Sequence, residues 1–467
     1  RGGQLDGRNE DEAVGVDLPG VGNAIVVGER KKVMPKGGIA RRRVGWRQRT
    51  VRLRGVAMKV SLQPHAGTDK GRPARGIGFR FIHSDRTIPG GATLPVDAPS
   101  RSPTGTFLIR TLGPPRLSCQ PRALGAGEGR TIVKALVKVS LGKGNLELRE
   151  LPDPVAGPGE VVMRVAATGV CGTDLHVEDD EYAVVPPVTI GHETSGRIVD
   201  IGPGVNGVAI GDRVTAMTTM WSCGTCDHCR SGELNRCPER HGLGAQANGA
   251  FATYLRLPAA NALRLPDNVS DEPASLTEPL ACCTRAVLEV ARLGEITPRH
   301  DTPIVVSGPG PIGLLCAQVA RAVGHRVIIL GTGADAARFA IARTLGFEEL
   351  IDVTTADPVT TISAITVGKG VPVVIEAAGA APSLAAAIEL ATRGGTVVQI
   401  GLYGKSVPVP IDRLVIREVT LRGSFASTPS SWRSALDLMA TGAVDLAPLV
   451  SQILPLEEWA AGFAAAR

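Results

Sequence analysis

A group of four cysteines is the first feature of the sequence that could do chemistry. In the stretch WSCGTCDHCRSGELNRCP, Cys223, Cys226, Cys229 and Cys237 stand close together. A redox dithiol needs only two cysteines, and nine cysteines in 467 residues are too few for a disulfide scaffold. Four thiolates fill the tetrahedral coordination of Zn²⁺ and leave no place for a substrate. The spacing therefore predicts a structural zinc site rather than a catalytic one.

A second, more dispersed set of residues has the chemistry of a catalytic zinc site. Cys171 stands in GVCGTDLH, and His192 and Glu193 follow in GHE. Thiolate and imidazole are good zinc ligands, and a catalytic zinc takes three protein ligands and keeps one position open. The third ligand could be Glu193, or Glu278 of TEPLACC. The residues alone leave this choice open.

A glycine-rich turn predicts a dinucleotide site. The sequence Gly308-Pro309-Gly310-Pro311-Ile312-Gly313 follows the apolar run PIVVS and opens the helical pattern LLCAQVARAVG. The first glycine permits a tight turn, the second lets the backbone approach a pyrophosphate, and the third lets the helix pack closely on the sheet. The amino end of the helix, with Pro311 and Ile312, then faces the phosphates.

The residue that would hold the cofactor ribose is less clear. By strand length its place falls near Gly331 to Gly333, where no carboxylate stands. Asp335 follows and could reach the 2′-hydroxyl, whereas Arg338 could meet the 2′-phosphate of NADP. The sequence therefore leaves NAD and NADP open.

The order of elements predicts two kinds of domain. From Thr131 to about Leu280, short runs such as GEVVMRVAATGV alternate Val and Ile with polar residues between glycines and prolines, which is typical of an all-β, barrel-like domain. From about Pro303, strands such as VPVVIEAAGA alternate with helices such as PSLAAAIELATR. This alternation predicts a parallel, doubly wound sheet.

Residues 1–130 differ from the rest in charge and pattern. They hold 24 Lys and Arg against 10 Asp and Glu, a net charge of +14, whereas the remainder has a net charge of −8. They contain no zinc-finger, helix-turn-helix or aromatic-stacking pattern, which argues against nucleic-acid binding. The chain begins with Arg, and acidic residues argue against an organelle presequence. We expect a disordered or mistranslated extension whose deletion leaves function intact.

Nothing in the sequence predicts a membrane or secreted location. The chain has no apolar run of membrane-spanning length, and its first residues, RGGQLDGRNEDEAVG, have no apolar core. Clustered cysteines that bind metal fit a reducing compartment. We therefore expect a cytoplasmic protein without a membrane partner.

From about residue 131 to the end, the sequence resembles the zinc-dependent medium-chain alcohol and polyol dehydrogenases. The motifs GVCGTDLH, GHETSGRIVDIGPGV, GDRV, GAFATY, EPLACC and GPGPIG occur in the family's order, together with the four cysteines. The resemblance implies a GroES-like catalytic domain at 131–283 and 425–467 and a Rossmann domain at 284–424. The family usually continues to a final strand after the helix in which this sequence stops, so we expect an unpaired sheet edge.

The resemblance also implies a role for each candidate residue. Cys171 and His192 would bind the catalytic zinc, and Glu193 and Glu278 would be the ligand or water-contacting carboxylates. Two residues of GVCGTDLH, Thr173 and His176, stand two and five positions after the cysteine, where the family has its proton relay.

The function implied by the resemblance is hydride transfer from a secondary alcohol to NAD or NADP. A glutamate at Glu278 resembles the polyol and threonine branches of the family, and the segment before GHE is more like that of sugar-alcohol enzymes. Threonine, butanediol or simple alcohols remain alternative substrates, and an inactive zinc- and nucleotide-binding relative is the alternative of another class. We expect a small-molecule substrate and a homodimer or homotetramer.

Overall fold

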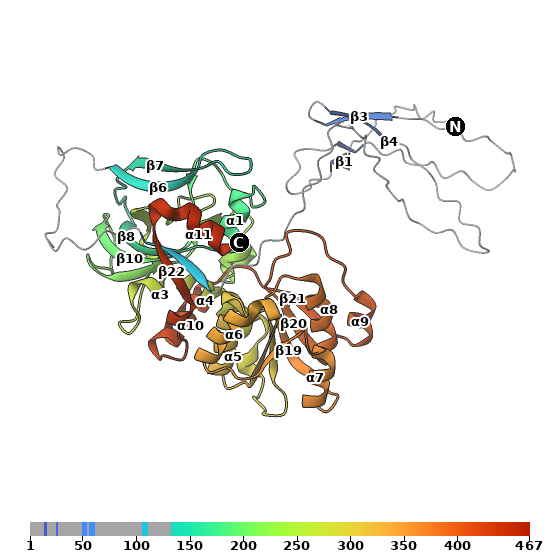
Figure 1. Cartoon of the computed structure of the whole chain (residues 1–467). Helices are drawn as coiled ribbons and strands as arrows, with labels where there is room; N and C mark the ends of the chain where they lie inside the picture. The colour runs from blue at the N-terminus through green and yellow to red at the C-terminus, as the bar shows by residue number, and fades with distance from the viewer. Residues whose placement is uncertain (1–13, 16–24, 27–48, 54–55, 61–104, 111–131) are drawn as a thin grey trace, which may run out of the picture. The chain divides into compact units, whose positions relative to one another are not determined.

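The protein divides by compactness into two units, Arg1–Asp97 and Ala98–Arg467. The computed structural model describes residues 14–15, 25–26, 49–53, 56–60, 105–110 and 132–467 (Figure 1). In the first unit, the described residues form two antiparallel pairs: β1 (Val14–Gly15) with β2 (Ile25–Val26), and β3 (Arg49–Leu53) with β4 (Val56–Val60). Most of the extension predicted at residues 1–130 lies outside the described residues.

A twisted sheet of short strands forms the catalytic half of the second unit. The central strand β8 (Glu160–Gly169) is buried along almost its whole length, so both faces of the sheet are covered there. In spatial order the strands are β15 (Ala262–Arg264), β11 (Arg213–Ala216), β10 (Glu193–Ile201), β8 (Glu160–Gly169), β5 (Thr106–Arg110) and β22 (Val450–Pro455), with β14 (Tyr254–Pro258) also paired to β8. Two smaller sheets complete this half: β7 (Leu146–Pro152), β6 (Ile132–Lys138) and β9 (Val188–Thr189), and β12 (Thr219–Trp221) with β13 (His241–Gly242).

Strand β5 differs from the sequence-based expectation, because it lies within the predicted extension. It pairs antiparallel with β8 and parallel with β22, so segments far apart in the sequence lie side by side (Figure 1). Gly105 leads into the strand with φ +91°, and a Cβ there would lie 2.6 Å from the carbonyl oxygen of Leu449. The sheet edge that we expected to be unpaired is therefore paired by residues 106–110.

The side chains of β5 are part of the core on both faces of the sheet. Phe107 and Ile109 pack in a cluster with Phe463 of helix α11 (Trp459–Ala466), whereas Leu108 packs in the main cluster on the other face of the sheet. All three side chains are buried. Since successive residues of a strand point to opposite faces, both faces of the sheet are covered at β5. The sequence pattern did not reveal this strand, since five residues bounded by an irregular segment carry little periodicity.

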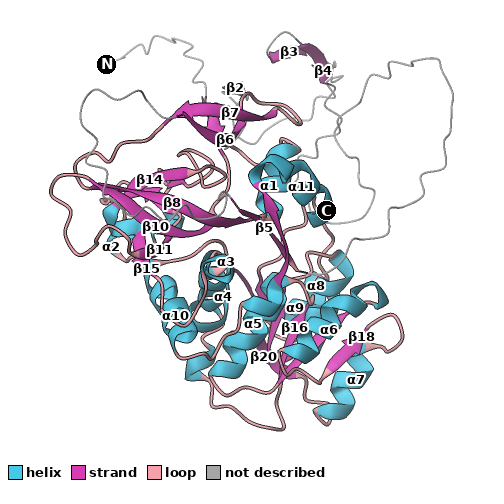
Figure 2. Cartoon of the chain, turned by 60° about the vertical axis from the view of Figure 1, so that its left-hand side comes forward, coloured by secondary structure: helices cyan, strands magenta, loops and turns pink. Residues whose placement is uncertain are grey.

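The second half of this unit is a doubly wound parallel sheet, as predicted. Its strands are β18 (Leu350–Asp352), β17 (Val327–Gly331), β16 (Ile304–Ser307), β19 (Val371–Glu376), β20 (Ala391–Gln399) and β21 (Thr420–Gly423). Ile304 and Val306 face one core cluster and Val305 faces another. Helices α5 (Pro311–Ala322) and α6 (Ala336–Thr344) cover the first face, and α7 (Pro358–Ile365) and α8 (Ala381–Leu390) cover the second (Figure 2).

The remaining helices are distributed over both halves of the unit (Figure 2). They are α1 (Gly172–Glu178), α2 (Asp227–Arg230), α3 (Asp271–Ala274), α4 (Thr277–Thr284), α9 (Ile411–Ile416), α10 (Pro429–Ala440) and α11 (Trp459–Ala466). One continuous apolar cluster runs from Leu108 of the catalytic sheet through Leu280 of α4 to Leu315 of α5. No helix among the described residues is both long and apolar enough to span a membrane.

Substitution of Leu108 tests whether β5 belongs to the folded domain. We expect Leu108→Ala to lower the free energy of unfolding by about 2–5 kcal/mol, since the side chain is fully buried. Arg110→Ala is the matched control on the same strand: its side chain is 45% exposed and makes only a 3.9 Å ion pair, so the change should stay below about 1 kcal/mol. Denaturant unfolding measures both. Equal and small effects would show that β5 is not part of the core.

Candidate active site and zinc sites

The four clustered cysteines converge in a geometry that suits zinc. Their sulfur atoms all lie within 4.8 Å of one another. The sulfur of Cys223 lies 3.8 Å from that of Cys229 and 3.6 Å from that of Cys237. Zn–S bonds of about 2.3 Å in a tetrahedron place sulfurs roughly 3.8 Å apart, whereas a disulfide needs about 2.05 Å. The spacing therefore fits a closed Cys₄ zinc site and excludes disulfides among these residues.

Backbone amides support the negative charge of this group. Cys226 caps the short helix α2, where its sulfur accepts from the amide of Cys229 at 3.4 Å. The amide of Cys226 in turn donates to the sulfur of Cys223 at 3.4 Å. This bond, with further ones from Thr225, lowers the pKa of Cys223 to about 6, so the thiolate form is favoured near neutral pH.

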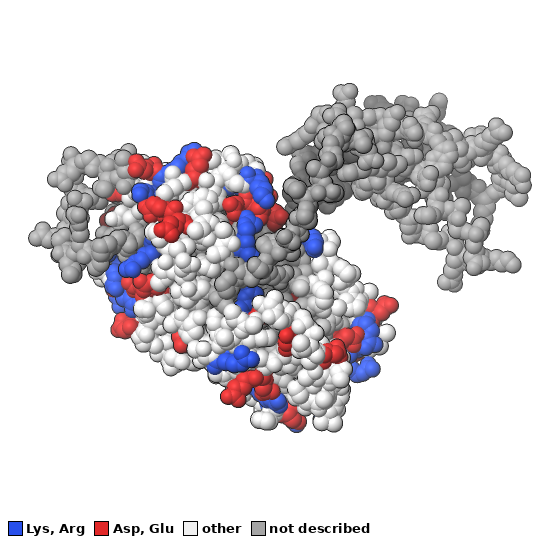
Figure 3. Space-filling model, viewed as in Figure 1, with Lys and Arg blue, Asp and Glu red and all other residues white. Residues whose placement is uncertain are grey.

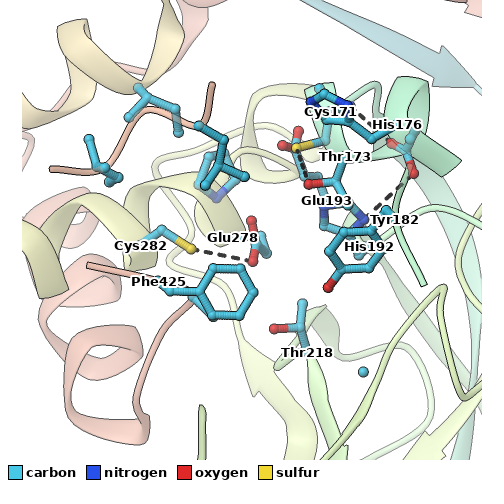
Figure 4. A pocket seen from close by; sticks show the side chains of 18 of the residues that line it. Cys171, Thr173, His176, Tyr182, His192, Glu193, Thr218, Glu278, Cys282 and Phe425 are labelled. Atoms are coloured by element: carbon cyan, nitrogen blue, oxygen red, sulfur yellow. Dashed lines mark hydrogen bonds and ion pairs between the residues drawn. The ribbon is translucent and has the colours of Figure 1, made fainter. Parts of the chain in front are cut away.

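The predicted catalytic residues are brought together by the pairing of β8 with β10. Cys171 follows the end of β8 and forms the N-cap of α1. His192 directly precedes strand β10. Glu193 is the first residue of β10 and pairs with Gly169 of β8. One potential ligand atom each from Cys171, His192 and Glu193 lies within 4.8 Å of the others. Figure 4 shows these side chains pointing toward one another.

The buried acidic groups of Cys171, Glu193 and Glu278 favour a bound cation. Burial, followed by the charges of Asp174 and Glu278, raises the pKa of Cys171 to about 11. Burial likewise raises the pKa of Glu193 well above its usual range, and that of Glu278. Oε2 of Glu193 is buried and has no hydrogen-bond partner among the described residues. An unpartnered carboxylate oxygen beside a buried thiol and an imidazole matches the donor set of zinc.

Asp174 is a site residue to which the sequence analysis gave no role. One of its oxygens accepts from the amide of Cys171 at 2.9 Å, and the other lies 3.6 Å from Nδ1 of His192. Burial raises the pKa of Asp174, and the neighbouring His192 opposes that shift. A carboxylate on Nδ1 leaves Nε2 of the imidazole for a metal, the usual outer arrangement of a zinc-bound histidine. The only sequence signal for Asp174 was its position three residues after Cys171, the N3 position of a capping box.

Glu278 lies on helix α4 and faces the same cavity from another side. Its Oε1 accepts from the thiol of Cys282 at 3.5 Å, as the dashed line in Figure 4 marks. It does not join the close group formed by Cys171, His192 and Glu193. Between the two carboxylates that the sequence left open, the geometry favours Glu193 as the third ligand.

The cavity that these residues line measures about 370 Å³ and opens between the two halves of the unit. The catalytic half contributes Tyr182 and Thr218 besides the zinc-type ligands, and the doubly wound half contributes Ile312, residues 377–379 and residues 400–402. A volume of this size suits a small molecule placed beside one end of a cofactor.

The two predicted relay residues lie in order from the cavity to its mouth. Thr173 lines the cavity, and its hydroxyl lies 3.6 Å from the sulfur of Cys171. His176 also lines it but is 36% exposed, and its Nδ1 lies 2.7 Å from Glu181. A Cβ placed on Gly404 of the doubly wound half would lie 3.8 Å from the His176 ring. His176 therefore stands where the two halves meet solvent.

The glycine-rich turn has the geometry that its sequence predicts. Gly308 has φ +102°, and a Cβ there would lie 2.7 Å from the amide nitrogen of Ala378. A Cβ on Gly313 would lie 1.8 Å from the carbonyl oxygen of Gly308, so helix α5 packs directly on the turn. Gly310, the N-cap of α5, has open space around it, and Pro311 is the first helical residue. Open backbone at a helix amino end suits a pyrophosphate.

The two residues predicted to contact the ribose, Asp335 and Arg338, are hydrogen-bonded to each other. Asp335 accepts from the amide and the hydroxyl of Thr332 at 2.9 and 2.8 Å, and Arg338 donates to it at 2.8 Å. Burial acts to raise the pKa of Asp335, but these hydrogen bonds lower it overall. Gly333, where a carboxylate is absent, lies beside this network. The ribose-binding roles of Asp335 and Arg338 stay predictions.

Comparison with known proteins identifies the family. Residues 157–267 match the alcohol dehydrogenase GroES-like domain family, and residues 311–441 match the zinc-binding dehydrogenase family. A sorbitol dehydrogenase of Halalkalibacterium halodurans is 39% identical over 329 residues, which cover 70% of this chain and 94% of that protein. The chain belongs to the zinc-dependent medium-chain alcohol and polyol dehydrogenases. It is a zinc- and NAD(P)-dependent oxidoreductase that acts on alcohols.

Two further relatives bear on substrate and cofactor. A D-arabitol-phosphate dehydrogenase of Enterococcus avium is 38% identical over 333 residues, covering 71% of this chain and 93% of that protein. The crystal structure of a zinc-binding dehydrogenase of Sinorhizobium meliloti bound to NADP has a TM-score of 0.65 and 31% identity. It covers 72% of this chain and 96% of that structure. This likeness agrees with the two-domain dehydrogenase fold described above.

Substitution in the four-cysteine group separates structure from catalysis. Because Cys226 both caps α2 and belongs to the closed group, we expect Cys226→Ala to release one zinc per chain and to lower thermal stability. Metal analysis and thermal unfolding measure the two effects. Substitution of Ser231, the exposed residue that ends α2, by Ala is the control and should keep the metal. Full zinc content and unchanged melting in Cys226→Ala would contradict the structural-zinc assignment.

Proposed function

We propose that this dehydrogenase oxidises a secondary hydroxyl of a polyol or sugar alcohol, with the catalytic zinc held by Cys171, His192 and Glu193. The observation that carries the proposal is the convergence of these three ligand atoms within 4.8 Å on the wall of a cavity. The opposite wall of the same cavity belongs to the cofactor domain. A hydroxyl and a nicotinamide can therefore meet in one enclosed space.

When bound, zinc polarises the alcohol oxygen and lowers the pKa of the hydroxyl. The chain's own residues orient this chemistry. Asp174 places a carboxylate oxygen 3.6 Å from Nδ1 of His192, and Gly169 leaves room for Glu193, since a Cβ there would lie 2.0 Å from Oε2 of Glu193. Glu278 places a second carboxylate on the cavity wall, beside Cys282.

Thr173 and His176 would transfer the alcohol proton to solvent. The Thr173 hydroxyl lies next to the reacting position and can accept the proton. His176, at the exposed mouth and hydrogen-bonded to Glu181, can pass it to solvent. The two residues are about one turn apart on α1 and line the same cavity, so both would lie beside a bound cofactor.

The cofactor domain positions the nicotinamide through a loop that the sequence analysis did not single out. Glu376, fully buried at the end of β19, accepts from the amides of Ala378 and Gly379 at 3.0 and 3.1 Å. These residues line the cavity beside Ile312. A buried carboxylate that orders backbone amides keeps this wall rigid where hydride transfer takes place.

The similarity to known relatives and the residues that line the cavity together indicate the substrate class. The sorbitol and arabitol-phosphate relatives are almost equally similar, which supports a polyol. Threonine, butanediol and simple alcohols are the alternative substrates, and a panel of these compounds assayed with NAD and with NADP distinguishes them. The cavity holds one tyrosine and one phenylalanine among its lining residues, Tyr182 and Phe425.

We place the enzyme in the cytoplasm. The eight cysteines among the described residues are all free, as a reducing compartment requires. Charges of both signs are interspersed on the visible face of the described part (Figure 3), and a small-molecule partner needs no extended charged surface.

Removal of zinc ligands tests the proposed function directly. We expect Cys171→Ala and His192→Ala each to lower kcat/KM for a polyol by roughly 10³-fold or more, since several kcal/mol of transition-state stabilisation is lost. Both variants should keep their fold and their binding of NAD(P)H. Circular dichroism measures the first property and fluorescence titration the second. His300→Ala, an exposed histidine outside the cavity, is the control. Full turnover in Cys171→Ala would disprove the assignment of the catalytic zinc.

We also propose a homodimer formed through the edge of the cofactor sheet. All four residues of the edge strand β21 are exposed, and so are the apolar side chains of Ile411, Val415 and Ile416 on the neighbouring helix α9. An exposed strand edge beside an apolar surface is a template for pairing with a second copy.

Light scattering during gel filtration should give about twice the 48.5 kDa chain mass, or a higher even multiple. Val415→Asp should shift the enzyme toward the monomer, because a charge would be buried at the interface. Ile210→Asp, an equally exposed isoleucine of the catalytic domain, is the control. A monomeric wild-type enzyme at micromolar concentration would contradict this proposal.

A further inference from the structure

We propose that Arg240 binds an oxyanion carried by the substrate, so that the enzyme acts on alcohols that bear a phosphate ester or a carboxylate in preference to neutral polyols. This inference rests on the proposed function and names the substrate class of the same cavity. Arg240 lines the cavity together with His192, Glu278 and Thr218.

The guanidinium of Arg240 is held in place but keeps its outer nitrogens free. Its backbone amide donates to the carbonyl of Cys237 at 3.1 Å, and its Nε donates to the hydroxyl of Thr219 at 3.0 Å. Within the described part of the chain, neither Nη atom has a hydrogen-bond partner, and no carboxylate lies within ion-pair distance. One nitrogen thus anchors the group while two parallel donors remain for a ligand.

The guanidinium of Arg240 lies against Gly242, which has no side chain to cover it. A Cβ built on Gly242 would lie 3.4 and 3.6 Å from the two Nη atoms of Arg240 and 3.5 Å from Oε1 of Gln246, and Gly242 lines the cavity. Leu243, Gly244 and Ala245 continue the lining from there. Space beside a guanidinium with two free donors suits the bidentate geometry of phosphate and carboxylate oxygens.

Arg240 shares one cavity with the residues that would hold the zinc. His192, Glu193 and Glu278 line this cavity together with Arg240, and it measures about 370 Å³. An oxyanion on Arg240 and a hydroxyl beside His192 can therefore belong to one small molecule.

The position of Arg240 also gives the four-cysteine loop a further role. Arg240 stands three residues after Cys237 and directly before β13, which pairs with β12. Its two anchors, the carbonyl of Cys237 and the hydroxyl of Thr219, come from the loop and from β12 respectively. The closed zinc site would therefore fix the place of an arginine that contacts substrate.

The alternative reading is that Arg240 only offsets the negative charge of the cavity. In that case neutral and anionic alcohols would depend on it equally. If Arg240 binds an oxyanion, its loss affects anionic alcohols more, because a site built to hydrogen-bond a group discriminates strongly by its presence.

The experiment compares kcat/KM for a pentitol phosphate, the same pentitol without phosphate, and L-threonine, in the wild-type enzyme and in Arg240→Gln. We expect the wild type to prefer one of the anionic alcohols over the neutral pentitol. In Arg240→Gln the ratio of anionic to neutral kcat/KM should fall about 10- to 100-fold, as for a lost hydrogen bond to a charged group. Arg240→Lys should recover part of the ratio, and the preferred anion identifies the phosphate or the carboxylate as the source.

The control is Arg264→Gln, an exposed arginine outside the cavity that pairs with Asp212 and should leave the ratio unchanged. The small oxyanion that matches the preferred substrate, inorganic phosphate or acetate, should inhibit the wild type competitively against the alcohol, and this test does not depend on the folding of Arg240→Gln. An absent preference for oxyanion-bearing alcohols, an unchanged ratio in a folded Arg240→Gln, or no competition by the matching oxyanion would overturn the inference. Failure of the proposed function is separate, because it would appear as no turnover of any alcohol in the wild type.

Discussion

The buried negative charge of the catalytic group is the constraint on which the rest of the site depends. Cys171, Asp174, Glu193 and Glu278 lie together in a region of low dielectric, and burial raises the pKa of each. Burial favours the protonated forms of the thiol and the carboxyls, which are poor metal ligands. In the proposed function, a divalent ion held by Cys171, His192 and Glu193 would favour the charged forms instead, so metal binding would release protons.

The fold serves this group by fixing two strand ends. The pairing of β8 with β10 sets Glu193 opposite Gly169, where only a glycine leaves space for the carboxylate. Strand β5 pairs with the same end of β8, from Leu108 opposite Gly169 onward, and the amide of Val170 donates to Phe107 at 2.8 Å. Strand β5 thus supports the strand that precedes Cys171, and we expect its removal to lower both activity and stability.

Residues with strong local signals were predictable from the sequence. The cysteine spacing and the glycine-rich turn carry their geometry in a few consecutive residues, and both have the expected form. The sequence leaves the choice between Glu193 and Glu278 open, and the proximity of Glu193 to Cys171 and His192 depends on the register of β10, which no local pattern encodes. Asp174, Glu376 and Arg240 were not predicted, because their hydrogen bonds to residues two or three positions away form no motif and their place at the cavity depends on the tertiary fold. Strand β5 was missed because its partners lie about 60 and 340 residues away, and five residues alone do not show a period.

The central claim is that the chain holds two zinc ions in different surroundings, a closed one and an open one. Crystal diffraction at the zinc absorption edge, on enzyme purified without added metal chelator, tests it most directly. The account predicts two anomalous peaks per chain, one among the sulfurs of the four-cysteine group and one bounded by Cys171, His192 and Glu193. A single peak, or a second peak whose ligands do not include Cys171 and His192, would contradict it.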